Sequence, residues 1–180
     1  MSMLGVTFLN EIVNKDKVLQ PSKILDRLRE KVISSLHQEE GETKDGMDIA
    51  IAVIDTTKKE LQFAGAYNPL YLIKKGENEI TKIKADRMPI GIHLKMNVNF
   101  TNHVIPYNSG DVIYLFSDGY VDQFGGEKGR KLKSKKFQEL LLNIKDKPMA
   151  EQKEILDKFL LKWRGDLEQL DDIIVIGLRL

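Results

Sequence analysis

The sequence predicts an α+β fold in which helices pack against layers of antiparallel β-sheet. Two segments with helical spacing of apolar residues come first, and six strand-like segments then follow one another through short turns. Two further helical segments and a last strand complete the order. Strands joined by tight turns pair antiparallel, and helices grouped before and after a run of strands favour this class over alternating βαβ units.

The helical pattern is already present at Met1, where apolar residues recur through Val13 with no capping residue ahead of them. A helix that begins normally shows Ser, Thr, Asp or Asn before its first apolar residue. We therefore expect a domain that is truncated at its N-terminus. A second helix is expected over residues 21–38, with Pro21 at its first position and one apolar face.

The spacing becomes strand-like after a charged loop over residues 39–46. Residues 47–55 and 60–66 flank Thr56–Lys59, which has an ordinary hairpin length. Other strands are expected over residues 71–75, 79–84, 96–105, 111–116 and 173–180, and other helices over residues 135–144 and 148–163. No repeat or linker interrupts this order, so we expect a single domain over residues 1–180.

Composition excludes several kinds of site. The 180 residues contain no cysteine, which rules out a disulfide framework, a thiolate zinc site and a cysteine nucleophile. The net charge of +1 argues against a broad nucleic-acid footprint. No stretch approaches the roughly 20 apolar residues of a membrane-spanning helix.

Acidic residues stand at the ends of two expected strands. Asp118 and Gly119 come directly after the apolar strand 112–116, and Asp171 and Asp172 come directly before the last strand. Carboxylates held at strand ends but open to solvent suit a hard divalent cation, which prefers oxygen ligands. The alternative interpretation is an ordinary Asp-Gly turn and a solvated acidic pair, since Asp-Gly is an abundant turn dipeptide.

Several motifs occur in the order found in one protein family. The chain resembles the C-terminal part of the PPM-type metal-dependent serine/threonine phosphatases, closest to their stage II sporulation protein E (SpoIIE) branch. The resemblance covers residues 1–180 and implies an incomplete form of the family's sandwich of sheets and helices. Its motifs are Asp45-Gly-Met-Asp-Ile-Ala-Ile51, Phe63-Ala-Gly-Ala-Tyr-Asn-Pro69, Met88-Pro-Ile-Gly91, Gly110–Asp122 and Asp171-Asp-Ile-Ile-Val-Ile-Gly177.

The resemblance implies a role for each acidic residue. Asp118 and Asp171 match metal-binding aspartates, and Asp122 matches an acidic position near an accessory metal. Gly119 matches a backbone position that lets the chain turn beneath the metal, and Asp172 lies beside the last ligand. The family motif Gly-Asp-x-x-Gly-His-Gly, which supplies further ligands, is not among the 180 residues.

The same resemblance implies the chemistry. The cofactors would be two Mn²⁺ or Mg²⁺ ions, which activate water for the hydrolysis of phosphoserine or phosphothreonine, so no catalytic side chain is expected. The expected partner is a phosphorylated regulatory protein in bacterial signal transduction, with no nucleic acid and no membrane contact. The expected location is the cytoplasm, including the cytoplasmic part of a membrane-tethered parent protein.

Two further expectations concern activity and assembly. Without the motif of the first half, we expect weak metal binding and little hydrolysis from these 180 residues. A different class of function, a non-catalytic phosphatase-like module that binds a partner protein, remains an alternative. Unpaired sheet edges and an uncovered apolar face would also favour a homo-oligomer.

Overall fold

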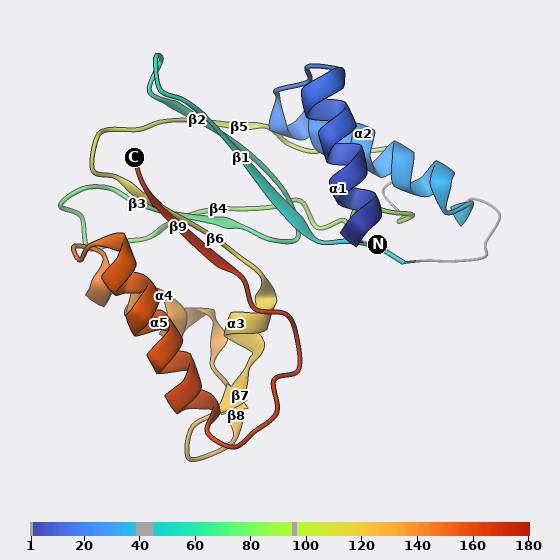
Figure 1. Ribbon diagram of the computed structural model, residues 1–180. Helices are drawn as coiled ribbons and strands as arrows, with labels where there is room; N and C mark the ends of the chain where they lie inside the picture. Colours follow the sequence, from blue (N-terminus) through green and yellow to red (C-terminus); the bar gives the residue numbers. More distant parts are fainter. Residues whose placement is uncertain (1, 39–44, 95–96) are drawn as a thin grey trace. The chain divides into compact units, whose positions relative to one another are not determined.

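The structure is a computed structural model, and it describes residues 2–38, 45–94 and 97–180 (Figure 1). Its contacts divide the chain into two compact units. The first comprises residues 1–70 and 83–107, and the second comprises residues 71–82 and 108–180. Each unit has its own hydrophobic core.

The first unit packs helices beside a three-stranded antiparallel sheet. Its strands β1 (Ile49–Asp55), β2 (Glu60–Ala66) and β5 (His103–Pro106) lie in the order β1-β2-β5. Helix α1 (Ser2–Asn10) continues into a π-helical segment, η1 (Glu11–Lys15), and helix α2 (Pro21–Ser35) follows. The apolar face of α2 forms much of the core together with the end of β2; its fully or almost fully buried residues are Ile24, Leu25, Leu28 and Val32.

The second unit is built on a four-stranded sheet. Its strands β3 (Leu70–Ile73), β4 (Thr81–Ile83), β6 (Val112–Phe116) and β9 (Val175–Arg179) lie in the order β4-β3-β6-β9. Helices α4 (Lys133–Ile144) and α5 (Met149–Arg164) contribute to the core with this sheet (Figure 1). Between β6 and α4 lie the short helix α3 (Asp118–Asp122) and the hairpin of β7 (Phe124–Gly125) and β8 (Arg130–Lys131).

A cluster of aromatic rings fixes α3 on this core. The ring of Phe137 on α4 lies 4.7 Å from that of Tyr120 and 5.0 Å from that of Phe116. The hydroxyl of Tyr120 donates a hydrogen bond of 2.9 Å to the backbone carbonyl of Leu156 on α5. Such ring pairs add to the free energy gained by burial, so the residue two positions after Asp118 is firmly anchored.

The expected fold class is confirmed, since both main sheets carry antiparallel strands with helices packed on them. The expected first helix, through Val13, ends earlier as an α-helix: α1 stops at Asn10, and the following residues form the π-helical segment η1. The expected strand 96–105 is also wrong: β5 begins only at His103, and residues 95–96 lie outside the described residues. Phe100 is instead buried in the first core, with the Arg29 guanidinium 4.9 Å from its ring centre.

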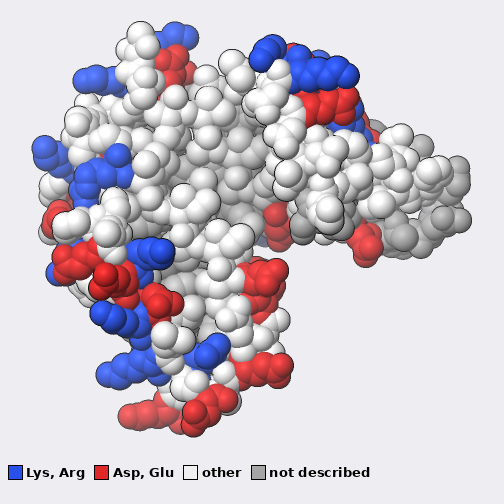
Figure 2. Space-filling model, in the orientation of Figure 1, with Lys and Arg blue, Asp and Glu red and all other residues white. Residues whose placement is uncertain are grey.

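Charged side chains of both signs cover part of the surface. On the face shown in Figure 2, acidic and basic side chains are mixed over α4 and α5. Of the helices in the described part of the chain, none is both long enough and apolar enough to cross a membrane.

Candidate metal site at the β6–β9 edge

The loops that carry the candidate acidic residues are joined at one edge of the second unit's sheet. Strands β6 and β9 pair antiparallel, with Phe116 opposite Val175, so the end of β6 meets the start of β9. Beyond this pair, Ser117 N–H donates to the carbonyl of Ile174 at 3.0 Å, and Ile174 N–H donates to Ser117 Oγ at 3.0 Å. The two chain segments are therefore held together one residue before Asp118.

Ser117 and Gly119 bring the backbone of Asp172 against α3. The hydroxyl of Ser117 donates to the carbonyl oxygen of Asp172 at 2.9 Å. A Cβ added at Gly119 would lie 2.5 Å from the same oxygen, which is closer than real Cβ contacts allow. Gly119 is thus required for the close approach of the two segments. Asp118 and Asp171 follow and precede this contact, and both are exposed to solvent.

Two of the acidic residues share a small cavity of about 150 Å³. Asp122 and Asp171 both line it, together with Gly119, Gln123, Phe124, Lys131 and Leu170. Asp118 is not among its lining residues. The Asp171 carboxylate accepts a hydrogen bond of 2.7 Å from the backbone N–H of Asp172. The structure therefore places Asp122 and Asp171 at one cavity, with Asp118 on the adjoining first turn of α3.

Lys131 compensates the charge of Asp122. Its ammonium lies 2.6 Å from the Asp122 carboxylate, with both side chains about half exposed. The β7–β8 hairpin creates this pair by placing Lys131 opposite Phe124, two residues after Asp122. In the sequence, Lys131 is one of several basic residues between Lys128 and Lys136. Because the pairing depends on the register of a two-residue strand, no local pattern could have identified Lys131.

The donor atoms at this edge fit a hard cation. Carboxylate oxygens of Asp122 and Asp171 line the cavity, and Gln123, which also lines it, has a buried side-chain oxygen with no hydrogen-bond partner among the described residues. Carboxylate and amide oxygens are the ligands that Mg²⁺, Mn²⁺ and Ca²⁺ prefer. Within the described ranges, no three His, Asp or Glu side chains lie close enough together to form a metal cluster.

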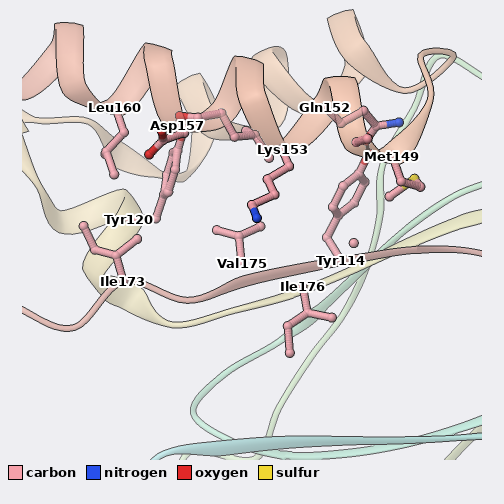
Figure 3. Close-up of a pocket in the computed structure, with 13 residues that line it drawn as sticks. Tyr114, Tyr120, Met149, Gln152, Lys153, Asp157, Leu160, Ile173, Val175 and Ile176 are labelled. Carbon is pink, nitrogen blue, oxygen red and sulfur yellow. Dashed lines mark hydrogen bonds between the residues drawn. The ribbon is translucent and has the colours of Figure 1, made fainter.

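A larger cavity, of about 630 Å³, lies between α5 and strands β6 and β9 (Figure 3). The hydroxyls of its two tyrosines already have hydrogen-bond partners within the protein. The Tyr114 hydroxyl donates to Gln152 Oε1 at 2.5 Å, and burial raises the pKa of Tyr114 to about 12. Burial also raises the pKa of Tyr120, whose hydroxyl donates to a backbone carbonyl. Both hydroxyls stay protonated at neutral pH, so neither is available as a base.

The chain matches the model of one protein family, and the match extends over residues 1–180. That family is described as stage II sporulation protein E (SpoIIE). No curated protein sequence matches the chain significantly.

Solved structures with the same fold include several phosphatase domains. The SiaA-PP2C domain of Pseudomonas aeruginosa superposes with a TM-score of 0.88 at 29% identity, covering 99% of this chain and 68% of that one. The RsbU and RsbW domains of Rv1364c from Mycobacterium tuberculosis superpose with a TM-score of 0.73 at 18% identity, covering 99% of this chain and 46% of that one. The catalytic domain of the serine/threonine phosphatase PstP, in complex with two manganese ions, superposes with a TM-score of 0.63 at 17% identity. The match covers 98% of this chain and 78% of that one.

Proposed function

The chain belongs to the stage II sporulation protein E family, and on this premise we propose that it is the metal-binding C-terminal part of a bacterial protein serine/threonine phosphatase domain. The observation that carries the proposal is the pair of hydrogen bonds between Ser117 and Ile174. They bring the segments bearing Asp118 and Asp171, which are far apart in the sequence, to one edge of the sheet.

Each residue has a distinct part in this proposal. Asp118 and Asp171 hold the cations through carboxylate oxygens, while Gly119 and Ser117 fix the distance between their backbones. Two Mn²⁺ or Mg²⁺ ions, when bound, would supply Lewis-acid activation of water and neutralise the phosphoryl oxygens of phosphoserine or phosphothreonine. Asp122 lies at the accessory position, where Lys131 balances its charge. Asp172 contributes its backbone carbonyl, which orients the loop.

The proposal extends to the substrate and the location of the protein. The substrate is a phosphorylated regulatory protein, and the chain acts in the cytoplasm, on its own or within a membrane-tethered parent. The Gly-Asp-x-x-Gly-His-Gly motif is not among the 180 residues. We therefore expect the isolated chain to bind Mn²⁺ weakly and to hydrolyse little p-nitrophenyl phosphate.

Mn²⁺ is expected to raise the thermal midpoint of the isolated chain, and Asp118→Asn or Asp171→Asn is expected to abolish most of that rise. A ligand that binds only the folded state stabilises it by RT ln(1 + L/Kd), where L is the free ligand concentration, so the shift at a given Mn²⁺ concentration reports the affinity. Differential scanning fluorimetry across a Mn²⁺ titration measures it. Glu154→Gln, at an exposed carboxylate on α5, is the matched control and should retain the full shift.

Two results would contradict this proposal. An unchanged Mn²⁺ shift in both aspartate variants would remove Asp118 and Asp171 as ligands. A turnover comparable to that of an intact family member, lost in Asp118→Ala, would keep the ligands but refute the expectation of weak activity.

A second candidate function, binding another protein chain, is supported by the edge strand β9. It is the outer strand of its sheet, and it carries the exposed apolar side chains Ile176 and Leu178, with exposed Ile174 directly before it; Ile176 is 57% exposed. Unpaired strand edges with apolar side chains favour pairing with a further strand. This is the surface through which we propose that the chain forms a homo-oligomer or binds a partner.

The isolated chain is therefore expected to associate at micromolar concentration, and Ile176→Lys is expected to shift it to monomer. Light scattering coupled to size-exclusion chromatography measures the mass of each species. Leu161→Lys, at a residue of α5 with 53% exposure, is a control that should leave the mass unchanged. A wild-type chain that remains a monomer at all concentrations would count against self-association.

A further inference from the structure

A third cavity in the same unit has four basic side chains in its lining. Its volume is about 220 Å³, and it lies where the β3–β4 turn, the start of β6, the end of α4 and the end of β9 meet. Its charged lining residues are Lys74, Lys75, Lys145, Asp146 and Arg179. From Val112, which lines it, to Ser117 is about 16 Å along the strand, so the cavity is separate from the edge that carries Asp118 and Asp171.

Lys145 is the unusual member of this group. Its side chain is only 10% exposed, yet its carboxylate partner, Asp146 at 3.2 Å, is 83% exposed. A buried ammonium is costly unless it is paired and hydrogen-bonded, and a solvated carboxylate on the neighbouring residue compensates it poorly. An ammonium has three donors, and its hydrogen bond to Asp146 Oδ1 is long, at 3.5 Å. Lys145 therefore has donor capacity to spare at the wall of the cavity.

Arg179 is held beside Lys145 by hydrogen bonds to the backbone, and the side chain of Lys75 passes close to Gly110. Arg179 Nη2 donates to the carbonyls of Lys145 and Lys147 at 2.8 and 2.9 Å. Gln152 donates to the same two carbonyls, so these oxygens at the end of α4 are already satisfied. The stem of Lys75 passes within 2.7 Å of the position of a Cβ at Gly110, which its lack of a side chain permits. The cationic groups thus come from three separate elements.

The charge balance and the size of the cavity define the ligand. Four cations and one carboxylate line it, and one of the four cations, Lys74, pairs with buried Asp111 at 2.9 Å. A volume of 220 Å³ is below the roughly 300 Å³ at which pockets for drug-sized ligands begin. It could hold about seven water molecules at roughly 30 Å³ each. A phosphate group with a short substituent matches this volume, and its negative charge suits a lining in which cations outnumber carboxylates.

We propose that this cavity binds a phosphate group, either as free phosphate or as the side chain of a phosphorylated residue. Lys145, Arg179 and Lys75 approach from the helix end, the strand end and the turn, so they can reach different oxygens of a tetrahedral anion. The site does not depend on metal or on Asp118.

The test is a titration of the 180-residue chain with inorganic phosphate in EDTA, at constant ionic strength maintained with NaCl. Phosphate is expected to raise the thermal midpoint, and Lys145→Gln should weaken the apparent affinity by about tenfold, the effect of one lost hydrogen bond to a charged group. Lys75→Gln should weaken it as well; this side chain is exposed, so its variant tests the site without altering the core. Lys158→Gln, at a lysine of α5 with 76% exposure, is the control.

The outcomes separate this site from the proposed metal site. Phosphate binding that persists in Asp118→Asn and weakens in Lys145→Gln supports the proposal, whether or not the chain binds Mn²⁺. Equal phosphate effects in the wild type, Lys145→Gln and Lys75→Gln overturn it, as does an effect lost only in Asp118→Asn. Competition by O-phosphoserine but not by serine would identify a phosphorylated side chain as the source, and competition by neither would identify free phosphate.

Discussion

The Gly119→Ala variant is expected to be less stable than the wild type by about 3 kcal/mol, in the upper range for overpacking, and to lose most of its Mn²⁺-induced stabilisation. The added Cβ would lie 2.5 Å from the carbonyl oxygen of Asp172 and 3.1 Å from its carbonyl carbon. These are backbone atoms, so the clash cannot be relieved by turning a side chain. Moving them would break the hydrogen bond from Ser117 to Asp172 and displace Asp171 from the edge.

Gly129→Ala is the matched control for this prediction. Gly129 has a positive φ of 53°, but a Cβ there would meet no heavy atom within 4 Å. Its cost should be only about 1 kcal/mol, from the left-handed backbone conformation, and its response to Mn²⁺ should equal that of the wild type. Urea unfolding followed by the fluorescence of Trp163 measures both variants. Equal stability of the two would show that the Asp172 segment is not held against Gly119.

The fold class could be predicted because the spacing of apolar residues changes clearly from helical to strand-like along the sequence. Helix α2 keeps its apolar residues on one face, and the mainly apolar strands β1 and β2 flank a four-residue turn. Short elements could not be predicted in this way. Helix α3 has only five residues and contains an Asp-Gly pair, which by itself indicates a turn; the contacts of Tyr120 with Phe137 and Leu156 stabilise it instead.

The candidate site could be predicted only in part, for a similar reason. Asp118 and Asp171 are recognisable because each lies beside a long apolar strand and matches a family motif. The pairing of Lys131 with Asp122 depends on a hairpin of two-residue strands. The basic cavity joins Lys75, Lys145 and Arg179, which are far apart in the sequence. Contacts of this kind follow from tertiary packing and leave no periodic signal.

The Asp111→Ala variant is expected to lose about 3 kcal/mol at neutral pH, the lower part of the range for breaking a buried ion pair. Asp111 is 1% exposed, and its carboxylate accepts hydrogen bonds from the N–H groups of Asn108 and Lys75 and from the Lys74 ammonium. These bonds tie the β3–β4 turn to the start of β6. Without the carboxylate, the backbone N–H groups of Asn108 and Lys75 and the Lys74 ammonium lose this acceptor.

The stability lost in the Asp111→Ala variant should also depend on pH. Burial alone would raise the pKa of Asp111, but the hydrogen bonds from Asn108, Lys75 and Lys74 outweigh it and hold that pKa below its ordinary value. A carboxylate with a lowered pKa in the folded state stabilises the protein above the unfolded pKa of about 3.9, and this contribution is lost as the pH falls through the folded pKa. The difference between wild type and variant should therefore be larger at pH 7 than at pH 3.

Urea unfolding at both pH values, followed through Trp163 in the same unit, measures this difference. Glu154→Ala is the matched control, since Glu154 lies in the same unit and also pairs with a lysine, Lys158, but its side chain is 67% exposed. Its loss should be the smaller of the two, because water can replace its hydrogen bonds. An Asp111→Ala loss that is the same at pH 3 and pH 7 would mean that the carboxylate stabilises the turn by its shape and not by its charge.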